Sequence, residues 1–305
     1  MKDIIPPVDK ELLLSELTED KFMRRTNYGD NLIYVCTAHD SPNIMREIGR
    51  LREITFRNAG GGTGKEADID EYDTAKFPYK QLIVWNEKEQ EILGGYRFIN
   101  LNKIPRKHHP GLKLATQGLL EFSEKFIKEY LPYTIELGRS FVRPEVQSAN
   151  TGRKTVFALD NLWDGLGALI KHNPNVKYFF GKVTMYTHFD KFSRDLILYF
   201  MNLHFKDEEH LVYPINPLGY HYPEKELARY FNGNDYEEDK KTLSKEVRKR
   251  GENIPPLINS YMNLSETMKC FGTSINTHFG NVEETGIMIT VDDIYESKKK
   301  RHLIF

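Results

Sequence analysis

Strand-like and helix-like apolar patterns alternate along the whole chain, and this alternation most constrains its fold. Short apolar runs predict strands at 31–38, 81–85, 92–101, 133–142, 178–185, 268–275 and 284–291. Apolar residues spaced three and four apart predict helices at 42–57, 121–130, 156–170 and 191–205. Because the two kinds of element are intermixed, the predicted class is α/β, or α+β with a mixed sheet.

Charge and composition exclude several classes of protein. Lys plus Arg is 43 and Asp plus Glu is 44 in 305 residues, so bulk charge gives no reason to expect nucleic-acid binding. No apolar run approaches the roughly 18–20 residues of a membrane helix, and the N-terminus does not resemble a signal peptide. We therefore expect a cytoplasmic protein. Cys36 and Cys270 lie in strand-like runs, which favours buried thiols, although one disulfide is possible.

The two ends of the chain and one internal segment differ in composition from the rest. Residues 1–30 are predicted to form an arm, and 216–252 a charged surface insertion with a helix at 241–250. Residues 293–305 form a basic tail. The histidines His108 and His109 have no Cys or carboxylate at ligand spacing, so no metal site is predicted. No Ser-His-Asp set indicates a covalent nucleophile.

Two charged clusters carry more information. Asp68, Asp70 and Asp73 follow the first helix, and their carboxylates repel one another unless cations or an ammonium ligand lie among them; a solvated acidic loop is the alternative. The strand at 134–142 carries Glu136 and Arg139 between apolar residues, which is costly unless the charges are paired or used. Alternation puts these two side chains on opposite faces, and a bulge at Gly138 would bring them to one face.

At these clusters the sequence resembles the fatty-acyl N-acyltransferases of the GNAT superfamily. These include ornithine-lipid N-acyltransferases and bacterial proteins labelled "hemolysin", with acyl-homoserine-lactone synthases as more distant relatives. The matching segments occur in order from residue 52 to about residue 291. They are Arg52–Phe56, Asp68–Asp73, Gly94–Phe98, Glu136–Pro144, Phe180–Met185, and Ile254–Ile258 with the Tyr261–Leu264 that follows it.

The resemblance implies a fold and a reaction. The fold is one GNAT-like domain over 31–292, with a mixed, mostly antiparallel sheet flanked by helices and splayed at strand 134–142. The reaction moves a long-chain acyl group from an acyl-carrier-protein or coenzyme A thioester to a small amino acid such as glycine or ornithine, with no bound cofactor. The coenzyme A loop pattern is not literal between Gln147 and Gly152, which favours the carrier protein, and Asp68 replaces a frequent Glu.

The resemblance also implies roles for individual residues. Glu136 accepts the amine proton, the strand end at Phe141 and Val142 supplies an N–H to the thioester oxygen, and Arg139 or Arg97 binds the substrate carboxylate. Asp70 and Asp73 orient the ammonium or hold Arg52 in place. The alternative for Glu136 is a structural ion pair with Arg97 or Arg139. The residues predicted to bind substrate are Arg52, Phe56, Arg97, Phe141 and Val142.

Partners follow from basic segments. An acidic carrier protein is predicted to dock on Lys103, Arg106, Lys107, Lys113, Arg153 and Lys154. The cluster Lys298–Arg301, followed by Leu303, Ile304 and Phe305, predicts peripheral contact with the inner membrane, with a solvated tail as the alternative. Two other functions stay open: an acyl-homoserine-lactone-type synthase, and a non-catalytic acyl-binding or lytic protein. The chain is longer than those synthases, and no residue set for S-adenosylmethionine is visible.

Overall fold

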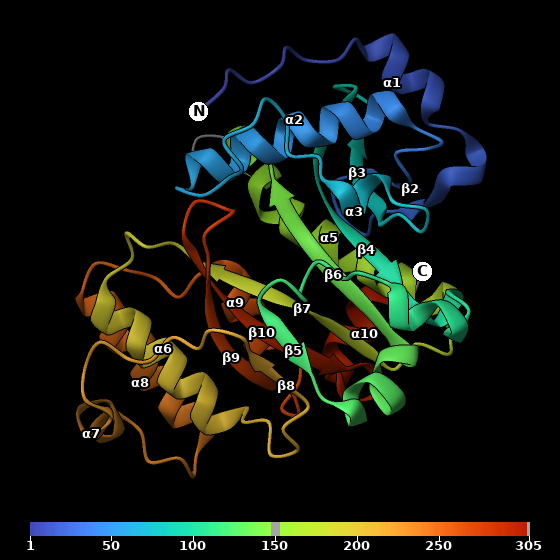
Figure 1. Cartoon of the computed structure of the whole chain (residues 1–305). Coiled ribbons are helices and arrows are strands. Elements are labelled where there is room, and N and C mark those ends of the chain that lie inside the picture. The colour runs from blue at the N-terminus through green and yellow to red at the C-terminus, as the bar shows by residue number, and fades with distance from the viewer. Residues whose placement is uncertain (148–152, 304–305) are drawn as a thin grey trace. The chain divides into compact units, whose positions relative to one another are not determined.

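The computed structural model describes residues 1–147 and 153–303, without the side chains of 110, 147, 153–156 and 158. Figure 1 shows the chain coloured by residue number from blue to red. The chain divides into two compact units. Unit 1 comprises 1–115, 133–177 and 296–305, and unit 2 comprises 116–132 and 178–295. Each unit is therefore assembled from segments that are distant in sequence.

Unit 1 contains an antiparallel sheet of five strands in the order β1-β2-β3-β4-β6. The strands are β1 (Phe22–Arg25), β2 (Leu32–Cys36), β3 (Lys80–Asn86), β4 (Glu91–Asn100) and β6 (Thr134–Val142). Two glycines of β4 permit close contact with the neighbouring strands. A Cβ on Gly95 would lie 2.5 Å from the Leu82 carbonyl oxygen, and one on Gly94 would lie 2.6 Å from that of Phe141.

The helices of unit 1 cover both faces of this sheet. They are α1 (Lys10–Glu16), α2 (Pro42–Asn58), α3 (Glu71–Thr74), α4 (Pro144–Gln147), α5 (Arg153–His172) and α10 (Glu296–His302). In α5, Gly165 lies against Leu82 and Tyr96, whereas Arg52 of α2 contacts Gln81, the residue beside Leu82. Neighbouring residues of a strand point to opposite faces, so α2 and α5 lie on opposite sides of the sheet.

Unit 2 contains the antiparallel strands β7 (Tyr178–Met185), β10 (Val282–Thr290) and β9 (Lys269–Asn276), in that order. A two-stranded ribbon joins β5 (Leu120–Phe122) to β8 (Val212–Pro214). An aromatic cluster lies in the core of unit 2, where Phe180 contacts Phe122, Phe126 and Phe271. The helices are α6 (Lys191–His204), α7 (Glu224–Leu227), α8 (Tyr236–Lys249) and α9 (Pro256–Met262).

The predicted fold class is confirmed, because mostly antiparallel sheets are flanked by helices. Cys36 and Cys270 are buried free thiols, as expected. No helix among the described residues is sufficiently long and apolar to cross a bilayer. The predicted domain bounds and the splaying of strand 134–142 stay predictions.

The predicted arm at 1–30 contains β1, which adds an edge strand to the sheet of unit 1. Two predicted helices begin at other residues than expected. The helix predicted at 121–130 begins only at 124, because 120–122 form β5 and pair with β8, and Phe126–Tyr130 is a π-helical turn. Helix α8 starts at Tyr236 rather than 241, because the Asp235 side chain accepts the Glu238 N–H and caps it there.

Candidate active site

Charged side chains from four parts of unit 1 gather on the α2 side of its sheet. Three are carboxylates and three are guanidinium groups, so the charges balance within the cluster. The residues are Arg52, Asp68, Asp70, Asp73, Arg97 and Arg139. Five of the six were predicted site residues, Asp68 was noted as part of the acidic triplet, and the structure brings all six together.

The acidic segment reaches α2 because of a glycine inside that helix. The Asp68 N–H donates to the Gly49 carbonyl at 2.9 Å. A Cβ on Gly49 would lie 2.6 Å from Ile69 Cγ1, so any larger residue would push the acidic segment away. Asp70 then caps α3 by accepting the Tyr72 N–H at 3.0 Å. The acidic segment thus contains a short helix that directs its carboxylates toward the sheet.

Arg52 and Asp73 form the fully buried part of the cluster. Arg52 Nη1 lies 3.3 Å from Asp73 Oδ2, and Gln81 contacts both residues. Burial would raise the pKa of Asp73, but the guanidinium groups of Arg52 and Arg97 outweigh it and lower that pKa to about 2. Asp73 is therefore an anion at neutral pH. This geometry supports the second predicted role of Asp73, which is to hold Arg52 in place.

Arg97 links the acidic residues to two aromatic rings. Its Nη1 donates to Asp70 Oδ1 at 2.7 Å and lies 3.2 Å from Asp73 Oδ2. The guanidinium also lies 5.4 Å from the ring centroid of Tyr72 and 5.2 Å from that of Tyr79. Burial opposes its charge, but Asp73 and Asp70 outweigh burial and raise the pKa of Arg97. Arg97 therefore stays charged inside the protein.

Arg139 lies in a bulge of β6, with φ of +52°. Gly138 pairs with Arg97 and Phe141 pairs with Gly95, so β6 has one residue more than β4 between these pairs. The predicted bulge is therefore confirmed, although the extra residue lies just after Gly138. The bulge brings Arg139 to the acidic residues, with Nε 2.8 Å from Asp68 Oδ2 and Nη2 3.8 Å from Asp70 Oδ2.

Glu136 is a buried carboxylate on the same face, with 1% of its surface exposed. Glu136 pairs with Ile99 and Gly138 pairs with Arg97, so alternation places Glu136 on the Arg97 side of the sheet. Its Oε1 accepts a hydrogen bond from the Tyr79 hydroxyl at 2.8 Å. Sequence analysis missed Tyr79, because no local pattern connects residue 79 with residue 136.

The remaining predicted substrate residues are Phe56 of α2 and Phe141 and Val142 of β6. Phe56 and Phe141 are buried, and Val142 is half-buried. Phe141 and Val142 pair with Gly95 and Gly94 in the ladder between β6 and β4. Their predicted contribution of an N–H to the thioester oxygen stays a prediction.

The predicted docking loop is exposed at all four described cations, Lys103, Arg106, Lys107 and Lys113. Arg106 contacts Tyr133, whose hydroxyl lies 3.3 Å from Arg106 Nη2. The side chains of Arg153 and Lys154 lie outside the described residues. His109 Nε2 lies 3.1 Å and 2.9 Å from two backbone carbonyls, which is a structural contact. Within 1–147 and 153–303 no group of His, Cys, Asp and Glu could hold a metal ion.

The basic tail forms helix α10, which packs on α5. Arg301 lies 2.9 Å from Asp160, and His302 Nδ1 lies 2.8 Å from Asp164 Oδ1. The solvated-tail alternative is therefore wrong for 296–302. Residues 304 and 305, part of the predicted membrane contact, lie outside the described residues.

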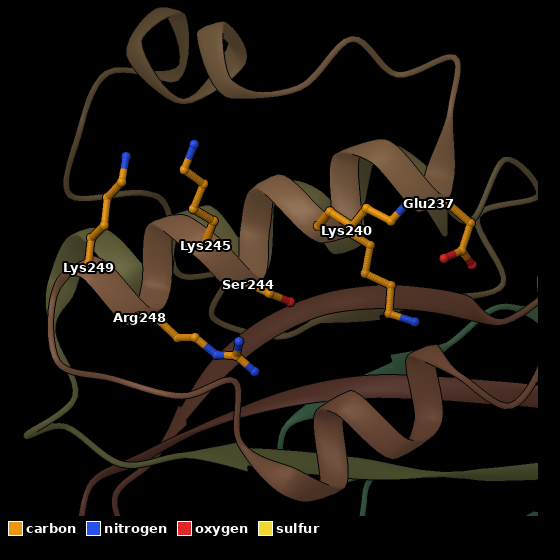
Figure 2. Close-up of a pocket in the computed structure, with 7 residues that line it drawn as sticks. Glu237, Lys240, Ser244, Lys245, Arg248 and Lys249 are labelled. Carbon is orange, nitrogen blue, oxygen red and sulfur yellow. The ribbon is translucent and has the colours of Figure 1, made fainter.

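Unit 2 has an open depression along α8, shown in Figure 2. Its lining is mostly cationic and comes from one helix. The residues are Glu237, Lys240, Lys241, Ser244, Lys245, Arg248 and Lys249. Sequence analysis predicted a charged helix here but no site.

Comparison with known proteins identifies similar sequences over almost the whole chain. Residues 51–155 match the family model described as an acetyltransferase (GNAT) domain. A glycine N(alpha)-acyltransferase of Phocaeicola vulgatus is 57% identical over 99% of this chain and 93% of its own length. A second protein of that description, from Bacteroides thetaiotaomicron, is 58% identical over 99% of this chain and 90% of its own.

Solved structures give weaker similarity. The acyl-homoserine lactone synthase LasI is 14% identical, with a TM-score of 0.31 over 50% of this chain and 72% of its own. A coenzyme-A-dependent synthase of the same kind, BjaI, is 9% identical, with a TM-score of 0.37 over 88% of this chain and 86% of its own.

Proposed function

Because the chain belongs to the family of the glycine N(alpha)-acyltransferases and is an acyltransferase of the GNAT type, we propose that it joins a long-chain fatty acyl group to glycine. The observation that carries this proposal is the identity of 57% over 99% of the chain. The donor is a thioester of an acyl carrier protein or of coenzyme A. The departure from the coenzyme A loop pattern favours the carrier protein.

The reaction is a direct attack of the amine on the thioester. The glycine nitrogen forms a bond to the thioester carbonyl carbon, the carbon–sulfur bond breaks, and the leaving thiolate takes up a proton. Glu136 accepts the proton that the ammonium must lose, directly or through one water. The strand end at Phe141 and Val142 stabilises the developing oxyanion with a backbone N–H.

Exposure separates the charged cluster into two groups. Arg139 and Asp70 retain 16% and 21% side-chain exposure, whereas Arg52, Asp73 and Arg97 are almost fully buried. A zwitterionic amino acid can therefore reach Arg139 with its carboxylate and Asp70 with its ammonium. The buried members then hold these two side chains in position, with Arg97 as the direct link to Asp70.

The product is amphiphilic, so we propose that the protein works in the cytoplasm with peripheral contact to the inner membrane. The carrier protein docks on the exposed cations between Lys103 and Lys113, since carrier proteins of this kind are acidic. Membrane contact uses the basic segment Lys298–Arg301 or another cationic surface.

The test is an assay of purified enzyme with palmitoyl-carrier protein or palmitoyl-coenzyme A as donor. Glycine, ornithine and S-adenosylmethionine are offered as separate acceptors, and products are identified by mass spectrometry. We expect N-palmitoylglycine. N-palmitoylornithine would show that the acceptor is ornithine rather than glycine. An acyl-homoserine lactone would indicate an acyl-homoserine-lactone-type synthase, and donor binding without any product would indicate an acyl-binding protein.

A further inference from the structure

We propose that Tyr79 is a positioning residue for the carboxylate of Glu136. This inference rests on the proposed role of Glu136 as proton acceptor. The Tyr79 hydroxyl donates to Glu136 Oε1 at 2.8 Å, and the backbone N–H of Ala115 donates to the same hydroxyl at 3.0 Å. Tyr79, with 1% exposure, therefore connects the start of β3 to β6 and to the segment that precedes unit 2.

The direction of these hydrogen bonds follows from the hydroxyl itself. A phenol has one proton to donate and lone pairs to accept. Since the Ala115 N–H occupies a lone pair, the phenol proton is directed to Glu136. Burial is the largest of the causes that raise the pKa of Tyr79 well above its usual value, so the phenol keeps this proton. The hydrogen bond therefore favours the charged form of Glu136, which is the form a base needs.

Removing the Tyr79 hydroxyl leaves the other charged and titratable side chains on this face chemically unaltered. They come from α2, from the acidic segment with α3, from β4 and from β6. The groups are Arg52, Asp68, Asp70, Tyr72, Asp73, Arg97 and Arg139. A change confined to the Tyr79 hydroxyl therefore isolates its effect on the titration of Glu136.

The test is Tyr79→Phe, measured as kcat/KM against pH with palmitoyl-carrier protein and glycine. We expect a loss of about 10-fold to 100-fold near neutral pH, typical of one hydrogen bond to a charged group. The acid limb of the profile, where kcat/KM falls as pH is lowered, should move to higher pH, so activity should recover as pH rises. Tyr72→Phe is the matched control, since its ring also lies beside Arg97, and it should leave the acid limb unmoved.

The outcomes separate this inference from the proposed function. A folded Tyr79→Phe enzyme with the wild-type acid limb overturns the positioning role. A Glu136→Gln enzyme with normal turnover would instead contradict the proposed role of Glu136 as proton acceptor. If Tyr79→Phe does not fold, 3,5-difluorotyrosine at position 79 keeps the ring and both hydrogen bonds. Its more acidic phenol is a stronger donor and should move the acid limb to lower pH, and an unmoved limb would contradict us.

A separate observation concerns the depression on α8, and from it we infer a surface that binds anionic lipid. Five of its seven lining residues are Lys or Arg and only Glu237 is acidic. Figure 2 shows the labelled side chains projecting from α8. The inference specifies the membrane contact proposed above.

Three of the five basic residues are not neutralised by an ion pair within the described part of the chain. Among the described residues, Lys241, Lys245 and Arg248 make no ion pair, whereas Lys249 lies 2.5 Å from Glu246. Lys241 and Lys245 are four residues apart, as are Lys245 and Lys249, and each such like-charged pair costs a helix about 0.2–0.5 kcal/mol. Buried Leu243 and Val247 hold the opposite face of α8 in the core, so the basic side chains must face outward.

The composition of the lining favours a lipid surface over a protein. The cores of protein interfaces are rich in aromatic side chains and poor in Lys, and this depression has no aromatic or large aliphatic residue. An anionic bilayer requires only a group of basic residues on an amphipathic helix. In α10, by contrast, Arg301 pairs with Asp160 and Lys299 pairs with Glu296.

The test is sedimentation with vesicles of phosphatidylglycerol and phosphatidylcholine in equal parts, against vesicles of phosphatidylcholine alone. We expect binding to the first only. Lys241→Glu with Lys245→Glu should lower the apparent affinity about 10-fold or more, because each basic residue near such a surface contributes about 1 kcal/mol. The matched control is Lys298→Glu with Lys300→Glu, which should change it little.

Three results would overturn the assignment of this surface to α8. The first is equal binding by the α8 variant and wild type, and the second is a loss confined to the tail variant. The third is a wild type that binds no vesicles while the α8 variant binds carrier protein more weakly than wild type in a direct binding titration, which would indicate a protein partner. None of these readouts requires acyl transfer, so the proposed reaction is tested independently.

Discussion

At the scale of single residues, the candidate site depends on burying charges in balanced pairs. Arg52 and Asp73 have no exposed side-chain surface, and such charges are tolerated only with a partner. Glu136 is almost as deeply buried, and its carboxylate accepts a hydrogen bond from the neutral Tyr79 hydroxyl.

Asp73→Asn should remove a pH dependence of stability. The folded-state pKa of Asp73, about 2, is depressed, so its ionisation stabilises the fold above the unfolded-state pKa of ~4 and this contribution disappears as pH falls toward 2. The contribution is about 2 kcal/mol. Urea unfolding between about pH 5 and pH 2 should give a flatter profile for Asp73→Asn than for wild type. Exposed Asp20→Asn is the control, and a wild-type slope in Asp73→Asn would contradict the prediction.

Glu136→Gln should lower turnover by roughly 10²–10⁴ with folding intact, because the amide keeps the shape but cannot accept the proton. Activity should recover in part at high pH, where the amine loses its proton unaided. Initial rates with palmitoyl-carrier protein and glycine measure this, beside exposed Glu145→Gln as the control. Near-normal turnover would leave Glu136 a structural role only.

At the scale of elements, long-range contacts hold the short helices of unit 1. The seven-residue helix α10 is too short to be stable alone. Its position depends on His302, which contacts Asp164, and on Gly167 of α5, where a Cβ would lie 2.1 Å from the His302 carbonyl oxygen. The backbone N–H of Asn27 also donates to Asp164, so α10, α5 and the segment after β1 share one carboxylate.

His302→Ala should lower the free energy of unfolding by about 1–3 kcal/mol, the cost of leaving a buried hydrogen-bonding group without its partner. Urea denaturation monitored by far-UV circular dichroism measures it. Lys300→Ala on the exposed side of α10 should change stability little. Equal stabilities of the two variants would show that α10 contributes nothing through His302.

At the scale of the whole molecule, a net charge of −1 leaves recognition of charged partners to local surfaces. The loop between Lys103 and Lys113 exposes four described cations. Attraction between exposed charges is screened within about 8–10 Å at physiological salt. A carrier protein that docks there should therefore be used less efficiently as salt increases.

Arg106→Glu with Lys107→Glu should raise KM for palmitoyl-carrier protein at low salt and reduce its dependence on salt, with kcat little changed. Steady-state rates at several salt concentrations measure both. Lys88→Glu, in the exposed turn between β3 and β4, is the control for a change in overall charge. An unchanged KM for the carrier donor would place its docking surface elsewhere.

Local sequence determined the elements whose patterns are local. The apolar spacing at 42–57, which includes Ile44, Ile48 and Leu51, predicted α2, because a helix buries one face at regular intervals. Glu136 and Arg139 were predicted to be site residues because they are charged residues on the otherwise apolar strand 134–142. Such a strand tolerates a charge only where the charge is paired or functional. The type of reaction was inferred from the resemblance of the sequence to the fatty-acyl N-acyltransferases of the GNAT superfamily.

Only the tertiary structure decided how these residues are partnered. The sequence did not show whether the three aspartates between 68 and 73 face a ligand or arginine side chains. The sheet register places Arg97 beside Gly138, and Gly49 lets the acidic segment approach α2, so the aspartates contact arginines. Tyr79 is 57 residues from Glu136, and only the pairing of β3, β4 and β6 brings the two together. Periodicity in a sequence reports which face of an element is buried, whereas a hydrogen-bond partner depends on register, bulges and close contacts between distant segments.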